Sequence, residues 1–154
     1  MDVAAALKNV DLFRDVPEPG LRAIAEVAEP VSVAAGDLIL VEGGPPDALY
    51  VITKGACRIF KEKGGDAMPV VMVHAFDQFG GSAMLDREPR SASVIATEPT
   101  ELLAFRAERL AGVLQKDPVT ASAFYRALAI SLFKRLRRTT DDLGIARLAF
   151  VLRS

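Results

Sequence analysis

The spacing of apolar residues divides the chain into three zones. Over residues 1 to about 29, apolar residues recur at helical spacing and are interrupted by Pro17-Glu18-Pro19-Gly20, which predicts a small group of helices. Over about 31 to 106, short β-rich runs alternate with glycine-containing turns at the spacing of roughly 8–12 residues that is typical of a sandwich or barrel. From about residue 107, helical spacing returns and continues to the end.

The middle zone predicts the fold class. Its expected strands are VSV, DLILVE, ALYVIT, ACRIFKE, PVVMVHAF, SASVIAT and ELLAFR. We predict an α+β fold that is mainly β, a double-stranded β-helix or jelly roll with N-terminal helices and a long C-terminal helix. Residues 1–116 are expected to form the roll and its helical lead-in, and residues 117–154 the long helix.

The long helix has a predicted start and one apolar stripe. Lys116 or Asp117 is expected to cap it, and Pro118 suits its first turn. Residues at steps of three and four then fall on one stripe: Leu128, Leu132, Leu136, Thr139, Leu143, Ala146 and Phe150. This stripe either packs on the domain's own sheet or forms a homodimer seam, and the length of the helix beyond the domain favours the seam.

Composition and charge narrow the possible classes. The chain has 154 residues, 51% of them hydrophobic, and a formal net charge of -1, which fits one globular domain and argues against nucleic-acid binding through overall basicity. The basic run from Lys134 to Arg138 is expected to be a solvated helix face paired with Asp141 and Asp142. The single cysteine, Cys57, excludes a disulfide framework, and no secretion signal or membrane-spanning stretch is present, so we expect a cytoplasmic protein without membrane contact.

Candidate chemistry lies in the stretch FGGSAMLDREPRSASV, which runs from Phe79 to Val94. Arg90 stands there among small residues in a segment with the pattern of a buried strand, and a buried charge needs a neutralising partner. A glycine-rich turn at Gly80-Gly81 that leads into a helical turn favours anion binding, and an arginine fork suits phosphate oxygens. Further hydroxyl donors in the stretch are those of Ser82, Ser91 and Ser93.

The spacing alone leaves a second interpretation open. Arg90 would then end outside the sheet and pair with Asp86, Glu88 or another surface carboxylate.

Other chemistries have little support in the sequence. His74 is the only histidine and lies in an expected strand, where a structural role is favoured over a haem-ligand role. One histidine excludes a histidine-based metal cluster and leaves no evident base for a serine or cysteine nucleophile. We therefore predict neither a metal site nor an enzyme.

The combined pattern resembles the cyclic nucleotide-binding domain family, in particular the sensor domains of bacterial regulators of the catabolite activator protein type. The letters that resemble its phosphate-binding cassette are Phe79-Gly80-Gly81, Ser82-Ala83-Met84-Leu85, the linker DRE and Pro89-Arg90-Ser91-Ala92-Ser93-Val94. Further matching letters include Gly36, Ile39, Glu42-Gly43, Leu49-Tyr50-Val51-Ile52, Gly55 and Glu101-Leu102-Leu103. The resemblance covers nearly the whole chain.

The resemblance implies roles for individual residues. Arg90 matches the arginine that grips the cyclic phosphate, Ser91 a hydroxyl that assists it, and Gly80 the glycine that lines the cassette. The family glutamate that accepts a hydrogen bond from the ribose 2′-hydroxyl falls at Gly81, and losing a charged acceptor lowers affinity by about 1.5–3 kcal/mol, or roughly 10- to 150-fold. Thr139-Thr140 match a threonine-serine pair that contacts adenine.

Two functions follow from the resemblance. The first is a sensor domain that binds a cyclic nucleotide, cyclic AMP by its threonine pair, and signals through a dimeric C-terminal helix. The second is an interaction or dimerisation module that has lost or changed its ligand, as Gly81 suggests. In regulators of this kind a winged helix-turn-helix follows the long helix, whereas this chain ends at Ser154 without a DNA-reading element, so we expect a sensor fragment or a stand-alone regulatory module.

Overall fold

The computed structural model of the chain describes residues 1–62 and 71–142, with side chains to residue 138. Short helices open the chain and two longer helices close it. Their bounds are α1 Val3–Leu7, the 3-10 helix η1 Asp11–Phe13, α2 Glu18–Glu26, α3 Ala107–Lys116 and α4 Pro118–Asp142. The helices predicted at both ends of the chain are therefore confirmed. No helix among the described residues has the length and apolar character needed to span a membrane.

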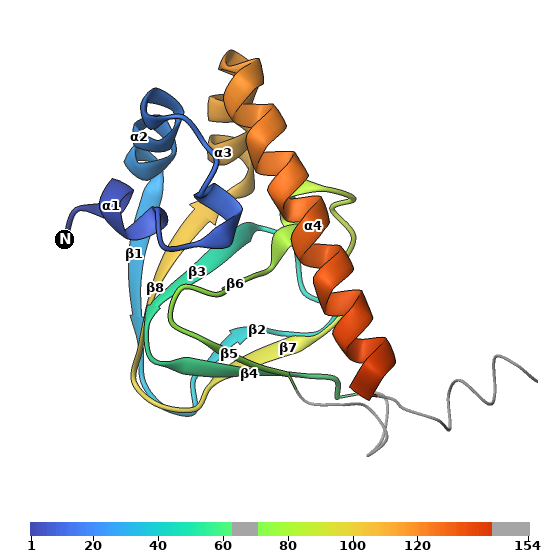
Figure 1. The fold of residues 1–154 in the computed structure, drawn as a ribbon. Coiled ribbons are helices and arrows are strands. Elements are labelled where there is room, and N and C mark those ends of the chain that lie inside the picture. Colours follow the sequence, from blue (N-terminus) through green and yellow to red (C-terminus); the bar gives the residue numbers. More distant parts are fainter. Residues whose placement is uncertain (63–70, 143–154) are drawn as a thin grey trace, which may run out of the picture.

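Eight strands between these helices form two antiparallel sheets (Figure 1). The strands are β1 Ala28–Val33, β2 Leu38–Leu40, β3 Ala48–Lys54, β4 Ala56–Phe60, β5 Val71–His74, β6 Gln78–Phe79, β7 Ser93–Ala96 and β8 Thr100–Arg106. One sheet has the order β1-β8-β3-β6 and the other β2-β7-β4-β5. This confirms the predicted jelly roll, and only the two-residue strand β6 was not expected.

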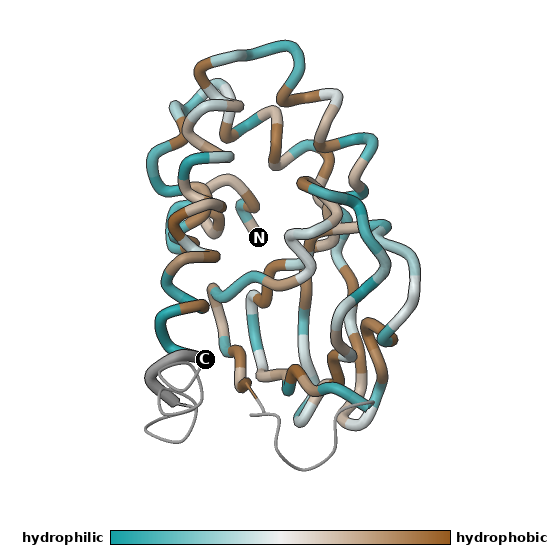
Figure 2. The backbone as a smooth tube through the Cα atoms, turned by 90° about the vertical axis from the view of Figure 1, so that its right-hand side faces the viewer, coloured by the Kyte–Doolittle hydropathy of each residue, from teal (hydrophilic) through white to brown (hydrophobic). Residues whose placement is uncertain are grey.

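The core has two parts, because the roll buries apolar residues both between its sheets and beneath the helices. Figure 2 shows hydrophobic and hydrophilic positions interspersed along the whole backbone rather than separated into long blocks. Between the sheets lie Leu40, Ile52, Cys57, Val73, Phe79, Val94, Ala96 and Leu102. Beneath the helices, the ring of Phe13 lies 5.6 Å from that of Phe105 and 5.9 Å from that of Phe124, which joins α4 to the roll.

Helix α4 begins at Pro118, and of the two predicted caps, Lys116 and Asp117, Asp117 caps it. The Asp117 carboxylate accepts hydrogen bonds from the Thr120 hydroxyl at 2.7 Å and from the backbone N–H groups of Thr120 and Val119 at 3.3 and 3.2 Å. These bonds satisfy the free N–H groups of the first turn and lower the pKa of the Asp117 carboxyl. The helix then runs along one side of the roll (Figure 1).

The predicted apolar stripe of α4 divides between two environments. Leu128 is fully buried in the domain's own core, so its assignment to a dimer seam is wrong, because Phe124 and Leu128 share the face that packs on the roll. Leu132 and Leu136, farther along the same stripe, are instead 43% and 62% exposed. Leu143, Ala146 and Phe150 lie outside the described residues, as do the side chains of Thr139, Asp141 and Asp142.

Candidate functional site

The glycine turn after β6 brings the backbone close to Arg90. Gly80 has a φ of 81°, in the left-handed region that glycine adopts without strain. A Cβ atom at this position would lie 3.0 Å from the Ala48 carbonyl oxygen and 3.0 Å from Arg90 Nη1. Both the conformation and the space at residue 80 therefore require glycine. The helical turn that follows is the 3-10 helix η3, Gly81–Met84, which is too short to supply a substantial helix dipole.

The guanidinium of Arg90 lies inside the domain, with 3% of the side chain exposed. Its Nη1 donates to the Gly80 carbonyl at 2.9 Å, and its Nη2 donates to the Ala48 carbonyl at 2.6 Å and to Asp47 Oδ1 at 3.2 Å. The carboxylate partner of the second interpretation is therefore found, and it is the other surface carboxylate, Asp47, rather than Asp86 or Glu88. The second interpretation, in which Arg90 ends outside the sheet, is wrong on this point, because three acceptors converge on its guanidinium inside the domain.

One donor of this guanidinium is unsatisfied. The Nε atom of Arg90 is shut off from solvent and has no hydrogen-bond partner among the described residues. Buried N–H groups are almost always paired, and an arginine fork holds planar anions through two parallel bonds. The cassette therefore has a spare charged donor, which an anionic oxygen would satisfy.

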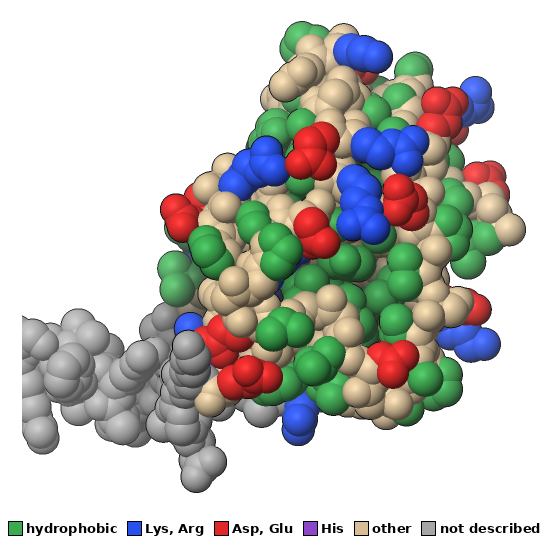
Figure 3. All heavy atoms as spheres, turned by 180° about the vertical axis from the view of Figure 1, so that it is seen from behind, with side chains coloured by type: hydrophobic (Ala, Val, Ile, Leu, Met, Phe, Trp, Pro, Cys, Tyr) green, Lys and Arg blue, Asp and Glu red, His purple; other side chains and the backbone are tan. Residues whose placement is uncertain are grey.

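Asp47 links Arg90 to a chain of surface charges. Its second oxygen, Oδ2, lies 3.6 Å from Arg106 Nη1, and Arg106 and Arg109 both bond Glu29, at 3.3 and 3.2 Å. Burial raises the pKa of the neighbouring Tyr50 hydroxyl, and the negative charge of Asp47 raises it further. On the face of the molecule seen in Figure 3, acidic and basic side chains are likewise interspersed rather than gathered by sign.

The other predicted site residues lie in different surroundings. Ser82 is half-buried in η3 and Ser91 is exposed beside Arg90. Ser93 is fully buried, and its hydroxyl accepts the Glu42 N–H at 2.9 Å, so it supports the roll. The backbone of Thr139-Thr140 continues helix α4, while their side chains lie outside the described residues.

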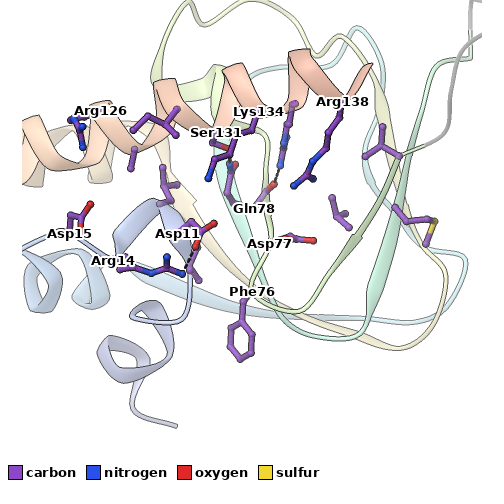
Figure 4. A pocket seen from close by; sticks show the side chains of 18 residues that line it. Asp11, Arg14, Asp15, Phe76, Asp77, Gln78, Arg126, Ser131, Lys134 and Arg138 are labelled. Atoms are coloured by element: carbon purple, nitrogen blue, oxygen red, sulfur yellow. Dashed lines mark hydrogen bonds and ion pairs between the residues drawn. The ribbon is translucent and has the colours of Figure 1, made fainter. Parts of the chain in front are cut away.

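Sequence reasoning missed the contacts between α4 and the start of the cassette. Gln78 Nε2 donates to the Ser131 hydroxyl at 2.7 Å, and the Gln78 carbonyl accepts a hydrogen bond from Arg135 (Figure 4). Burial lowers the pKa of the Arg135 guanidinium, which the Asp77 charge partly offsets. A polar residue before the two glycines was the only local signal of this contact, and its partner is 53 positions away.

A groove of about 340 Å³ lies beside these contacts, between η1, the β5–β6 region and α4 (Figure 4). Its α4 wall carries Arg126, Lys134 and Arg138. The opposite wall carries Asp11 and Asp15. Neither Arg90 nor Gly80 lines this groove, so the spare donor belongs to a separate place in the fold.

Residues 1–62 and 71–138 show neither a metal-ligand cluster nor a reactive cysteine. No group of three or more histidine, cysteine, aspartate or glutamate side chains in this part of the chain is arranged to hold a metal ion. Cys57 is fully buried, and burial raises the pKa of its thiol, which keeps it protonated and unreactive. The His74 side chain is exposed at the end of β5.

Comparison with protein families gives a match over most of the roll. The model described as "Cyclic nucleotide-binding domain" matches residues 30–117, more than half of the chain. The matched range contains the glycine turn, Arg90 and Asp47.

Individual proteins resemble the chain over wider ranges. A "Cyclic AMP receptor protein" of Thermus thermophilus is 34% identical over 111 residues, which are 71% of this chain and 50% of that protein. A "CRP-like cAMP-activated global transcriptional regulator" of Mycobacterium tuberculosis is 29% identical over 141 residues, 90% of this chain and 60% of that protein. The chain thus spans about half to three fifths of the length of these relatives.

A solved cyclic nucleotide-binding domain from Methylobacillus flagellatus has the same fold. Its TM-score is 0.78 at 24% identity, over 91% of this chain and 79% of that chain.

Proposed function

Because the chain belongs to the cyclic nucleotide-binding domain family, we propose that its cassette binds a cyclic nucleotide, cyclic AMP, as a regulatory ligand. The observation that carries the proposal is the buried Nε of Arg90, a charged donor without an acceptor. It lies in a guanidinium that Gly80, Ala48 and Asp47 already hold in place. A preorganised donor of this kind binds an anion without losing side-chain entropy.

The proposed ligand contacts follow from the residues around Arg90. The cyclic phosphate accepts from Nε of Arg90, and the exposed Ser91 hydroxyl adds a second donor. Gly81 provides no acceptor for a ribose hydroxyl, so we propose a lower affinity than a cassette with a carboxylate here would have. Thr139 and Thr140 are proposed to contact the adenine base. The Thermus and Mycobacterium relatives, whose names refer to cyclic AMP, support this choice of nucleotide.

The proposed output is helix α4 in a homodimer. Its outward face carries four large apolar or aromatic side chains that are 38–63% exposed: Tyr125, Leu132, Phe133 and Leu136. Contiguous exposed apolar groups on one helix face are typical of an association surface. A ligand shifts such a helix only through a difference in affinity between two arrangements of it. We propose a regulatory role of this kind, without catalysis, in the cytoplasm.

A second function has one specific observation in its favour. A β-carbon at Gly81 would lie 3.0 Å from a methyl group of Leu128, with the amide oxygen of Gln78 farther away at 3.9 Å. An apolar neighbour at this point suits an interaction module that keeps the roll and the helix but has lost or changed its ligand.

Isothermal titration with cyclic AMP and cyclic GMP separates the two functions. We expect saturable binding of cyclic AMP, its loss in Arg90→Leu, and its retention in Arg87→Leu. Arg87 is the matched control because it lies in the same loop but is exposed and pairs with Glu108 at 3.1 Å. Circular dichroism shows whether Arg90→Leu still folds, and the milder Arg90→Lys is used if it does not.

Absence of heat and of thermal stabilisation with both nucleotides, up to high micromolar concentration, would contradict nucleotide binding. Equal loss of binding in Arg87→Leu and Arg90→Leu would contradict the assignment to Arg90.

A further inference from the structure

Helix α4 is seated on the start of the cassette by three contacts from one of its faces. Leu128 faces Gly81, Ser131 accepts the side chain of Gln78, and Arg135 donates to the carbonyl of Gln78. Residues 128, 131 and 135 follow each other at steps of three and four, so they lie in one row along the helix. Figure 4 shows Gln78 and Ser131 meeting between β6 and α4.

The polar contacts fix where α4 lies along the cassette. Gln78 is only 7% exposed, and its buried amide is stable only with a partner at the position of Ser131. Sliding the helix by one residue would remove this partner. The two bonds of Gln78 therefore set the register of α4.

The distance between helix and cassette depends on residue 81. A β-carbon at Gly81 would lie 3.0 Å from Leu128 Cδ1, closer than side chains ordinarily pack. Leu128 is fully buried in the same cluster as Ala83 and Met84 of η3, so it has little room to move aside. Unlike Gly80, Gly81 does not adopt a positive φ, so the backbone itself accepts any side chain here. The steric constraint at residue 81 is therefore the space taken by Leu128.

We propose that Gly81 is the positioning residue that lets α4 lie against the cassette, because even an alanine at residue 81 would force Leu128 or the helix to shift by a few tenths of an ångström. The two adjacent glycines then contact both Arg90 and helix α4. The Gly80 carbonyl holds the Arg90 guanidinium, and the next residue receives Leu128. The position of α4 and the arrangement around Arg90 are thereby coupled through two adjacent residues.

Hydrogen exchange of Gly81→Ala tests the seat without any ligand. We expect amides of residues 128–138 to exchange about five- to tenfold faster than in the parent chain, while β3 and β8 keep their protection. The matched control is Gly112→Ala in α3, where a β-carbon would meet nothing within 4 Å. An alanine in a helix without a clash stabilises it, so the control should slow exchange or leave it unchanged.

A double variant isolates the contact. Leu128→Val removes the methyl groups that approach Gly81, so adding Gly81→Ala in that background should change exchange by less than about twofold. The proposal would be overturned if the amides of residues 128–138 exchanged no faster in Gly81→Ala than in Gly112→Ala. The proposal would also be overturned if Gly81→Ala accelerated exchange as much in the Leu128→Val background as it does in the parent chain.

The coupling to Arg90 rests on the proposed function and has its own readout. The Gly80 carbonyl accepts from the Arg90 guanidinium and the next residue faces Leu128, so Gly81→Ala should change the affinity for cyclic AMP by up to the factor by which exchange accelerates. Faster exchange with unchanged affinity would overturn the coupling. If exchange were faster in Gly81→Ala but neither this variant nor the parent chain bound nucleotide, the proposed function would be refuted. The proposed role of Gly81 in positioning α4 would still stand.

Discussion

The two faces of helix α4 meet different surroundings between residues 118 and 138. The inner face places Phe124 and Leu128 in the core and Ser131 on the cassette. The outer face leaves Leu132, Phe133 and Leu136 between 43% and 63% exposed. Leucines at 128, 132 and 136 are thus identical in type and regular in spacing, yet only the first contributes to the domain's core.

The difference shows that apolar periodicity locates a helix without saying what each apolar residue packs against. The roll covers a row of residues on one side, and the other side needs a partner or remains exposed. The inner face is accordingly expected to control stability, and the outer face to control association.

The largest expected effect is on the free energy of unfolding, which a substitution on the inner face should lower far more than one on the outer face. Phe124→Ala should lower the free energy of unfolding by about 3–5 kcal/mol, because it empties a buried site against the ring of Phe13. Phe133→Ala should change it by no more than about 0.5 kcal/mol. Urea denaturation at low protein concentration measures both. Similar losses in the two variants would break the distinction between the faces.

A smaller effect tests the polar contact of the inner face. Ser131→Ala should lower the free energy of unfolding by about 1–3 kcal/mol, because it leaves the buried Gln78 amide without its acceptor. Ser122→Ala, at an exposed position earlier in the same helix, is the matched control and should be close to neutral. Thermal unfolding of the two variants checks this, and equal melting temperatures would mean that Gln78 finds another acceptor.

The outer face is tested through self-association. Phe133→Glu should weaken the proposed dimer at least about tenfold, equivalent to about 1.4 kcal/mol, since it sets like charges into an apolar interface. Analytical ultracentrifugation over a range of concentrations measures this. Lys134→Glu, on the groove side of α4, is the control for a charge change. A parent chain that stays monomeric throughout would refute the dimer.

The smallest expected effect concerns the start of the helix, which both faces share. The pKa of Asp117 is lowered in the folded state by its bonds to Thr120 and Val119, so the unfolded chain binds more protons near its ordinary pKa of about 3.9. The stabilisation is therefore complete above that pH and is lost as the pH falls through the lowered value. Between about pH 5 and 2.5, the free energy of unfolding should fall less steeply with decreasing pH in Asp117→Asn than in the parent chain, because asparagine does not titrate. Denaturation at several pH values measures this. An unchanged slope would contradict the cap's contribution.

Features governed by local spacing were predictable from the sequence. The alternation of short apolar runs and glycine turns predicted the jelly roll, and Asp117-Pro118 predicted the start of α4, because strand pairing and capping depend on neighbouring residues. The stretch from Phe79 to Val94 predicted the cassette through its own letters. The family match across residues 30–117 includes this stretch.

Only the tertiary structure decided which groups meet across the fold. Asp47 is 43 residues from Arg90, and Ser131 is 53 residues from Gln78, so no local pattern couples either pair. Gly80 and Gly81 are adjacent and identical in the sequence, yet the first is required by its backbone angle and the second by the methyl group of Leu128. A sequence specifies where a side chain can be omitted, but the packing of distant elements determines what fills the space.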